Sequence, residues 1–211
     1  MKNFYILRYE YYGKKRPFGM DILLPGCERI SCKELAINGL KPACVDMNIK
    51  ILADSELQDI ESAGTRILVS KKFRDIVNKE GLKGLLYNEV VEYKYSQLNK
   101  EIESVLNKVN EIFDYKPIWP EFEWKLSPDS GCRLARKCHK CNWEEWTSPV
   151  NGIWIEQEDL PDVDFLRIRE MPGVIIISEK AKLALEQGEI SNIKTILSTD
   201  FQPTESSVDK L

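Results

Sequence analysis

The sequence predicts an α+β protein with mixed sheets that contain two strand, helix, strand units. The main observation is a weak internal repeat, because Arg66–Lys72 resembles Val174–Lys180 and each copy follows a glycine. A second is the spacing of apolar residues across 98–112, which recur every three or four positions as in an amphipathic helix. With 43% hydrophobic and 30% charged residues, the composition is that of a globular protein.

The N-terminal part of the chain predicts two strands and a loop. Phe4–Tyr12 is rich in aromatic and β-branched residues and should form a strand that ends at Gly13. Met20–Leu24 should form a second strand. The cysteine-bearing segment Cys27–Cys44 follows as a loop, with a short helix at Lys33–Ile37.

The two repeat copies predict the same local structure. In each, an apolar strand runs into a serine, Ser70 or Ser178, that can cap a helix of about ten residues. The helices should end at Gly81 and near Gly188, and a strand should follow each one, at 85–93 and 193–198. Both a true duplication and a common supersecondary pattern that arose twice account for this repeat.

The repeat and the prolines between its copies suggest a division of the chain. Ser96–Phe113 is the predicted amphipathic helix, and we expect it to pack on its own core in preference to a partner. Two prolines in Lys116–Pro120 interrupt it, since neither can donate to a helical ladder. We therefore expect an N-terminal α+β subdomain at 1–115, a C-terminal one at 116–201, and a flexible tail at 202–211.

Charge and hydropathy narrow the class of partner. The net charge of −4 disfavours nucleic acid, although Lys14–Arg16 and Arg133–Lys140 are basic clusters. No apolar run reaches the roughly 20 residues of a membrane span. Charge at Arg8 and Glu10 interrupts the N-terminal apolar patch before a signal-peptide core could form, so we expect a cytoplasmic protein without a membrane partner.

The cysteines are the candidate metal ligands. Cys138 and Cys141 form a CxxC motif, in which two thiolates can reach one tetrahedral ion from a tight turn. Closing a structural zinc site requires two more ligands, and Cys27 with Cys32 is the best second pair. The predicted cofactor is therefore a structural zinc ion.

Other interpretations of the cysteines stay open. Cys44 and Cys132 compete as ligands, and several of the six cysteines could be ordinary buried residues. A thioredoxin-like redox role fits the letters CxxC, but no apolar strand precedes the motif. His139 is the single histidine and no nucleotide-binding or nucleophile motif is present, so we do not expect an enzyme.

Aromatic and acidic residues flank the CxxC motif. Four of the five tryptophans fall in or beside Trp119–Trp124 and Trp143–Trp146. Such residues could anchor and steer a basic protein partner, while the simpler interpretation places the tryptophans in the core and the acids on a solvated loop. The acidic residues that follow are Glu156, Glu158, Asp159, Asp162 and Asp164.

These motifs together resemble the double-CXXCG immunity proteins of bacterial toxin systems. The second motif of that family is similar to Cys138–Cys141, and the segment after it is similar to Leu160–Lys180. The family's central segment resembles Ile67–Gly84. Asn142 stands where the family has a glycine, and the pair Cys27 and Cys32 has four intervening residues.

The resemblance implies a cytoplasmic protein that binds and neutralises a cognate toxin, with zinc-bound cysteines as part of its scaffold. The acidic charge would suit a basic toxin. The alternative is a zinc-knuckle regulator that contacts nucleic acid through its two basic clusters.

Overall fold

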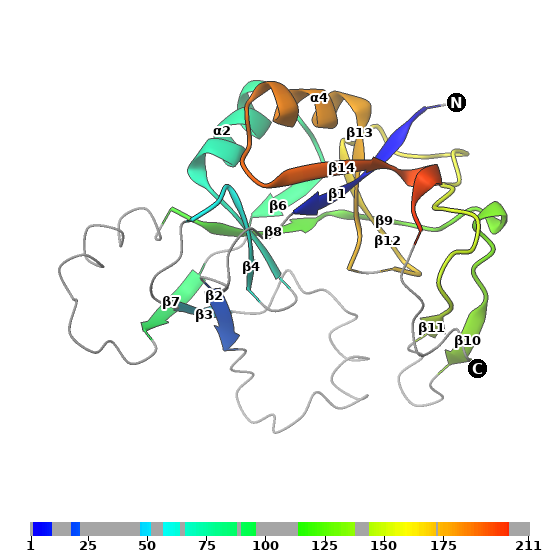
Figure 1. The fold of residues 1–211 in the computed structure, drawn as a ribbon, viewed down its shortest axis with the longest axis horizontal. Coiled ribbons are helices and arrows are strands. Elements are labelled where there is room, and N and C mark those ends of the chain that lie inside the picture. Colours follow the sequence, from blue (N-terminus) through cyan, green and yellow to red (C-terminus); the bar gives the residue numbers. More distant parts are fainter. Residues whose placement is uncertain are drawn as a thin grey trace.

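The computed structural model describes residues 2–9, 18–21, 47–51, 57–63, 66–87, 90–95, 114–137, 144–171 and 173–202. This part of the chain forms two α-helices and four sheets, which confirms the predicted α+β class. Figure 1 shows α2 (Lys71–Lys79) and α4 (Glu179–Gln187) together on one side of the strands. The predicted helices at 33–37 and 96–113, the zinc knuckle and the tail beyond Gln202 lie outside the described residues.

The strands belong to both halves of the sequence. In chain order they are β1 (Phe4–Tyr9), β2 (Phe18–Asp21), β3 (Met47–Ile51), β4 (Ile60–Ala63), β5 (Arg66–Val69), β6 (Leu85–Tyr87), β7 (Val90–Tyr95), β8 (Lys116–Pro120), β9 (Phe122–Trp124), β10 (Leu134–Lys137), β11 (Glu144–Trp146), β12 (Phe165–Ile168), β13 (Ile175–Ser178) and β14 (Ile193–Leu197). Short 3-10 helices lie at Pro128–Ser130 and Ser198–Asp200.

A five-stranded sheet of order β14-β1-β13-β12-β9 is buried on both faces. Successive residues of a strand point to opposite faces, so the apolar runs of β1, β12 and β13 supply two cores. The core beneath the helices receives Leu7, Phe165, Ile175 and Ile177. The core on the other face receives Phe4, Ile6, Leu166, Ile168 and Ile176.

A four-stranded antiparallel sheet of order β4-β5-β8-β6 completes the first core. Its central strand β8 is the segment that the sequence predicted only as an interruption of a helix. Pro117 pairs with Leu68 of β5 and Pro120 pairs with Leu85 of β6. The predicted strand 85–93 is also different, because it forms β6 and β7 in two separate sheets.

Both predicted helix starts are confirmed. The Ser70 hydroxyl accepts a hydrogen bond from the Phe73 N–H at 3.2 Å, and the Ser178 hydroxyl accepts one from the Ala181 N–H at 3.0 Å. Each bond satisfies one N–H that the first turn of a helix leaves without a partner. The helices end at Glu80 and Gly188, close to the predicted positions.

The two repeat copies have the same topology over more of the chain than the sequence indicated. The strand order β4-β5-β8-β6 matches β12-β13-β1-β14, every pairing in both is antiparallel, and a helix follows β5 and β13 in the same way. The second copy begins with β8 at residue 116. However, β1 lies in the sheet of the second copy and β8 in that of the first, so each sheet contains strands from both sides of the predicted subdomain boundary.

Candidate functional site

An antiparallel strand pair flanks the CxxC motif. Strand β10 pairs with β11, and Lys137 lies opposite Glu144 at the end of the pair. Residues 138–143, which contain Cys138 and Cys141, connect these two positions. The pairing brings the two ends of this segment to within about 5 Å, the separation of opposed residues in an antiparallel pair.

A second antiparallel pair flanks the other cysteines. Phe18 of β2 lies opposite Ile51 of β3, and residues 22–46 connect the two strands. Both pairs lie in the chain between the first strand of a repeat and its β-hairpin, β4–β5 or β12–β13. Figure 1 shows both on the side of the molecule away from α2 and α4.

The four predicted ligands Cys27, Cys32, Cys138 and Cys141 lie outside the described residues, as does Cys44. Within the described ranges, no three His, Cys, Asp or Glu side chains are grouped closely enough to hold a metal ion. The strand pairs therefore define only where the two cysteine-bearing segments begin and end.

Cys132 is the one described cysteine, and its surroundings differ from those of a metal ligand. It is half-buried and packs against the second core. Strand β10, at Leu134–Lys137, separates Cys132 from the CxxC motif in the chain.

The base of the β10–β11 pair is fixed by a buried serine. The Ser130 side chain is fully buried, its hydroxyl donates to the Trp154 carbonyl at 3.1 Å, and it accepts from the Trp154 N–H at 2.8 Å. The Ser130 carbonyl also accepts from the Val150 N–H at 3.0 Å. These bonds join the chain just before β10 to the chain just after β11.

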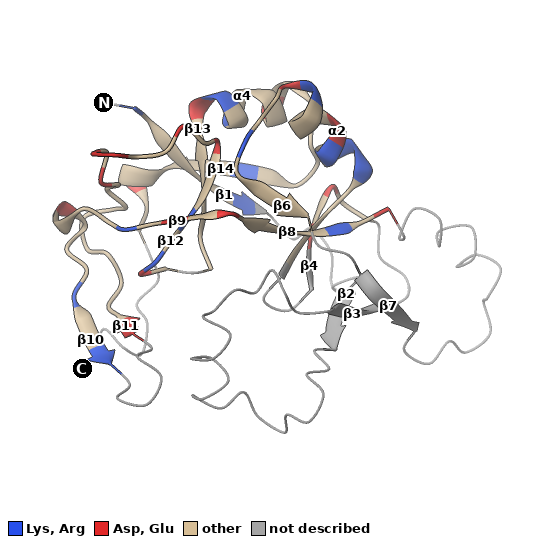
Figure 2. Cartoon of the chain, turned by 180° about the vertical axis from the view of Figure 1, so that it is seen from behind, with Lys and Arg blue, Asp and Glu red and all other residues tan. Residues whose placement is uncertain are grey.

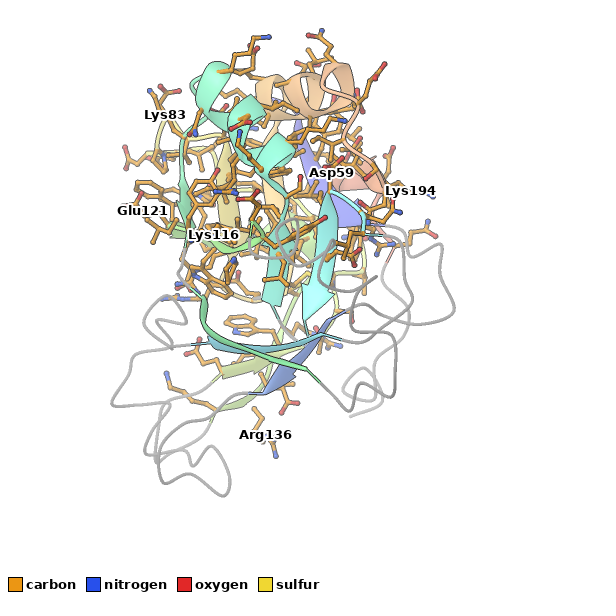
Figure 3. All side chains as sticks on the ribbon, turned by 90° about the vertical axis from the view of Figure 1, so that its left-hand side faces the viewer. Asp59, Lys83, Lys116, Glu121, Arg136 and Lys194 are labelled. Atoms are coloured by element: carbon orange, nitrogen blue, oxygen red, sulfur yellow. The ribbon has the colours of Figure 1, made fainter. Side chains whose placement is uncertain are left out.

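Two residues of the basic cluster form ion pairs across this strand pair. Arg136 forms an ion pair with Glu145 at 2.7 Å and Lys137 forms one with Glu144 at 2.8 Å. The Lys137 hydrogen bond lowers the pKa of the Glu144 carboxyl below its ordinary value. Figure 2 shows the basic strand β10 beside the acidic β11, and Figure 3 places Arg136 at the pole opposite the helices.

The tryptophans serve the scaffold. Trp119, Trp124, Trp146 and Trp154 are half-buried, and Trp143 lies outside the described residues. The Trp124 indole packs against the second core and donates to the Glu156 carbonyl at 2.6 Å. The Arg167 guanidinium stacks on Trp119 at 5.0 Å from the ring centre. These contacts favour the simpler of the two interpretations made from the sequence.

The acidic run divides into surface and buried members. Glu158, Asp159 and Asp162 are exposed, and Asp162 contacts the Lys83 ammonium at 3.2 Å, which lowers its pKa. Asp164 is 9% exposed and accepts a 2.6 Å hydrogen bond from the Ser178 hydroxyl. It therefore supports the start of α4 and does not belong to a solvated acidic loop.

Two further carboxylates escaped the sequence analysis. Asp59 accepts a 2.6 Å hydrogen bond from the Ser70 hydroxyl, as Asp164 does from Ser178. Glu61 is 1% exposed, and burial raises its pKa to about 7. Asp59 follows from the repeat if it is aligned with Asp164, because each aspartate immediately precedes the first strand of a hairpin.

No protein-family model matches the chain, and no curated protein is similar to it in sequence. No helix in the described part of the chain is long and apolar enough to cross a membrane.

Proposed function

We propose that the protein is an immunity protein that binds and neutralises a cognate bacterial toxin in the cytoplasm, without catalysing a reaction. The observation that carries the proposal is the equivalent placement of the two cysteine-bearing segments. Each connects an antiparallel strand pair at the same point of a repeat. This arrangement fits the paired cysteine motifs of the double-CXXCG immunity proteins that the sequence resembles.

The cysteines serve the scaffold in this proposal. Cys27 and Cys32 from one segment and Cys138 and Cys141 from the other would supply the four thiolates of a tetrahedral zinc site. A bound zinc ion would contribute its binding free energy to folding, because its ligands are not assembled in the unfolded chain. The paired strands β2–β3 and β10–β11 define where the two segments begin and end.

The surface chemistry favours a basic protein partner over nucleic acid. Glu158 and Asp159 are exposed, and neither forms an ion pair with a described basic residue. Unpaired acidic charge of this kind accelerates association with a basic protein. In contrast, Arg136 and Lys137, which a nucleic-acid partner would require, are paired with glutamates across the strand pair.

Co-expression with the protein encoded by the adjacent gene tests the proposal. We expect growth arrest by that protein alone, rescue by this chain, and a stoichiometric complex on size-exclusion chromatography. The single variant Glu158→Lys should slow association at low salt, and Asp75→Lys on α2, which changes the net charge by the same amount, is the control. Absence of a complex together with salt-sensitive DNA or RNA binding would replace the proposal with the zinc-knuckle regulator.

A further inference from the structure

The first strands of the two repeats are exchanged. In the second repeat Leu7 of β1 lies opposite Ile175, and in the first repeat Ile118 of β8 lies opposite Ile67, the equivalent position. The other edges correspond as well, because Leu7 lies opposite Thr195 of β14 and Ile118 lies opposite Tyr87 of β6. Each repeat therefore supplies its first strand to the sheet of the other.

Two aspartates hold the exchanged repeats together in a reciprocal manner. Asp59 of the first repeat accepts a 2.9 Å hydrogen bond from the Ser191 N–H of the second. Asp164 of the second repeat accepts a 2.9 Å bond from the Lys83 N–H of the first. Both donors occupy the same place, between the helix of a repeat and its last strand.

Two lysines form a second reciprocal pair of contacts, each with a carbonyl just after the helix of the other repeat. Lys72 on the first turn of α2 donates to the Glu189 carbonyl just after α4. Lys180 on the first turn of α4 donates to the Gly81 carbonyl just after α2, at 3.2 Å. A cation at a helix C-terminus is favourable because the last carbonyls carry partial negative charge.

The next pair of equivalent positions is Gly84 and Asn192, and each lies against the first residue of a strand in the other repeat. Both have positive φ, 95° and 55°. A Cβ atom on Gly84 would lie 2.5 Å from the Phe165 carbonyl, while the Asn192 amide bonds the backbone N–H and carbonyl of Ile60. Ile60 and Phe165 begin β4 and β12, so the correspondence extends to the strand that each loop contacts.

These contacts are reciprocal between the two repeats, as contacts are between the subunits of a symmetric dimer. We propose that a second copy of this chain is a partner of the same fold, and that β1 of one copy fills the position between β13 and β14 of the other. Exchange of β1 between two copies requires no new contact surface, because each contact that β1 makes within the single chain is made again between the two copies. Such exchange is a low-cost route to a dimer. This proposal does not rest on the toxin-binding function.

The position between β13 and β14 must always be occupied. Phe4, Ile6 and Leu7 are 5%, 2% and 5% exposed and contribute to both cores. Fully burying an apolar side chain of this size contributes about 2 kcal/mol, so a sheet without β1 would lose several such contributions. The single chain and the exchanged dimer both fill the position, and protein concentration during folding decides between them.

Refolding of the wild-type chain from denaturant at several concentrations provides the first measurement. Light scattering after size-exclusion chromatography should show a dimer whose ratio to monomer rises with the refolding concentration, by about tenfold for a tenfold increase while monomer predominates. A ratio that does not change with concentration, or monomer alone, would overturn the proposal.

Cross-linking distinguishes the exchanged dimer from any other. A chain with Ile6→Cys is refolded together with a chain carrying Ile176→Cys, since these residues are opposed on β1 and β13. We expect an interchain disulfide between positions 6 and 176, mapped by mass spectrometry to separate it from links between native thiols. The control partner carries Leu68→Cys, the equivalent position in the first repeat beside β8, and should give no link. Equal yields from both partners would refute specific exchange of β1.

Discussion

Glu61 of β4 is a carboxyl group buried inside the protein without a counter-ion among the described residues. Its side chain is 1% exposed. One oxygen accepts a 2.9 Å hydrogen bond from the Gln58 N–H, while the other has no hydrogen-bond partner in the described structure. Burial raises the pKa from 4.5 to about 7, and the Gln58 hydrogen bond lowers it only in part. Glu61 should therefore be largely protonated in the folded protein below neutral pH.

This pKa makes stability depend on pH with a definite sign. Between the unfolded and folded pKa values the folded state binds more protons than the unfolded state, so the free energy of unfolding falls as pH rises. At about 1.4 kcal/mol per pKa unit, the shift corresponds to a loss of about 3 kcal/mol, most of it between about pH 5 and about pH 8. Glu61→Gln removes the titration while keeping an oxygen for the Gln58 N–H.

Urea denaturation of both proteins across this pH range measures the effect. The variant should gain stability relative to wild type as pH rises, by about 3 kcal/mol at the alkaline end, and should show little difference near pH 5. Glu158→Gln, at an exposed carboxylate, is the control and should follow the wild-type curve. Parallel curves for wild type and Glu61→Gln would mean that the buried carboxyl is already ionised below neutral pH, and the reasoning from burial would fail.

The remaining predictions concern the backbone, a helix cap and the metal. Gly84→Ala should destabilise by at least about 2 kcal/mol more than Gly81→Ala in urea denaturation, because its Cβ would meet the Phe165 carbonyl whereas the space at Gly81 is open; equal losses would contradict this. Ser178→Ala should lower the free energy of unfolding by about 1–2 kcal/mol, because it removes the cap of α4. An unchanged Tm would mean that the cap is not formed. With the proposed zinc site, Cys138→Ser should lower Tm by at least about 5 °C, and chelator-treated wild type should match it. Affinity for the proposed toxin should be retained below Tm, and affinity loss at unchanged Tm would place the cysteines at the interface.

The helices were predictable because their start signals are local. Ser70 and Ser178 bond N–H groups only three residues ahead, so a short stretch of sequence contains the whole interaction. The aspartates that orient these serines were missed because Asp59 and Asp164 are separated from them by a complete hairpin. The amino-acid pattern of one cap carries no information about a carboxylate so far away in the chain.

Strand β8 was missed because its prolines argue against a central strand. The register explains why they are tolerated. Strand β5 pairs with residues 116–118 and β6 with residues 118–120, so Pro117 and Pro120 each have a paired neighbour on one side only. A proline has no backbone N–H to donate. A residue that is paired on one side only needs no donor toward the other side, so proline is tolerated there.

The exchange of β1 and β8 could not be predicted because the two positions that they occupy are alike. Each strand offers apolar residues for burial, and each position lies between an apolar strand that precedes a helix and the strand that follows that helix. Local patterning fixes which residues are buried, but it does not choose between two equivalent sheets. That choice depends on contacts across the whole chain, such as those of Asp59 with Ser191 and of Asp164 with Lys83.

The two repeats differ at one buried position. Aligning Asp59 with Asp164 places Glu61 at the position of Leu166, a fully buried member of the second core. A carboxyl group in place of a core leucine reduces stability, since its charged form is costly to bury. The exchanged strands also differ, because β1 has Arg8 stacked on Phe201 while β8 has Trp119 at the equivalent position. The two repeats therefore differ in the cost of burial at this position, where the first has a carboxyl group and the second has a leucine side chain.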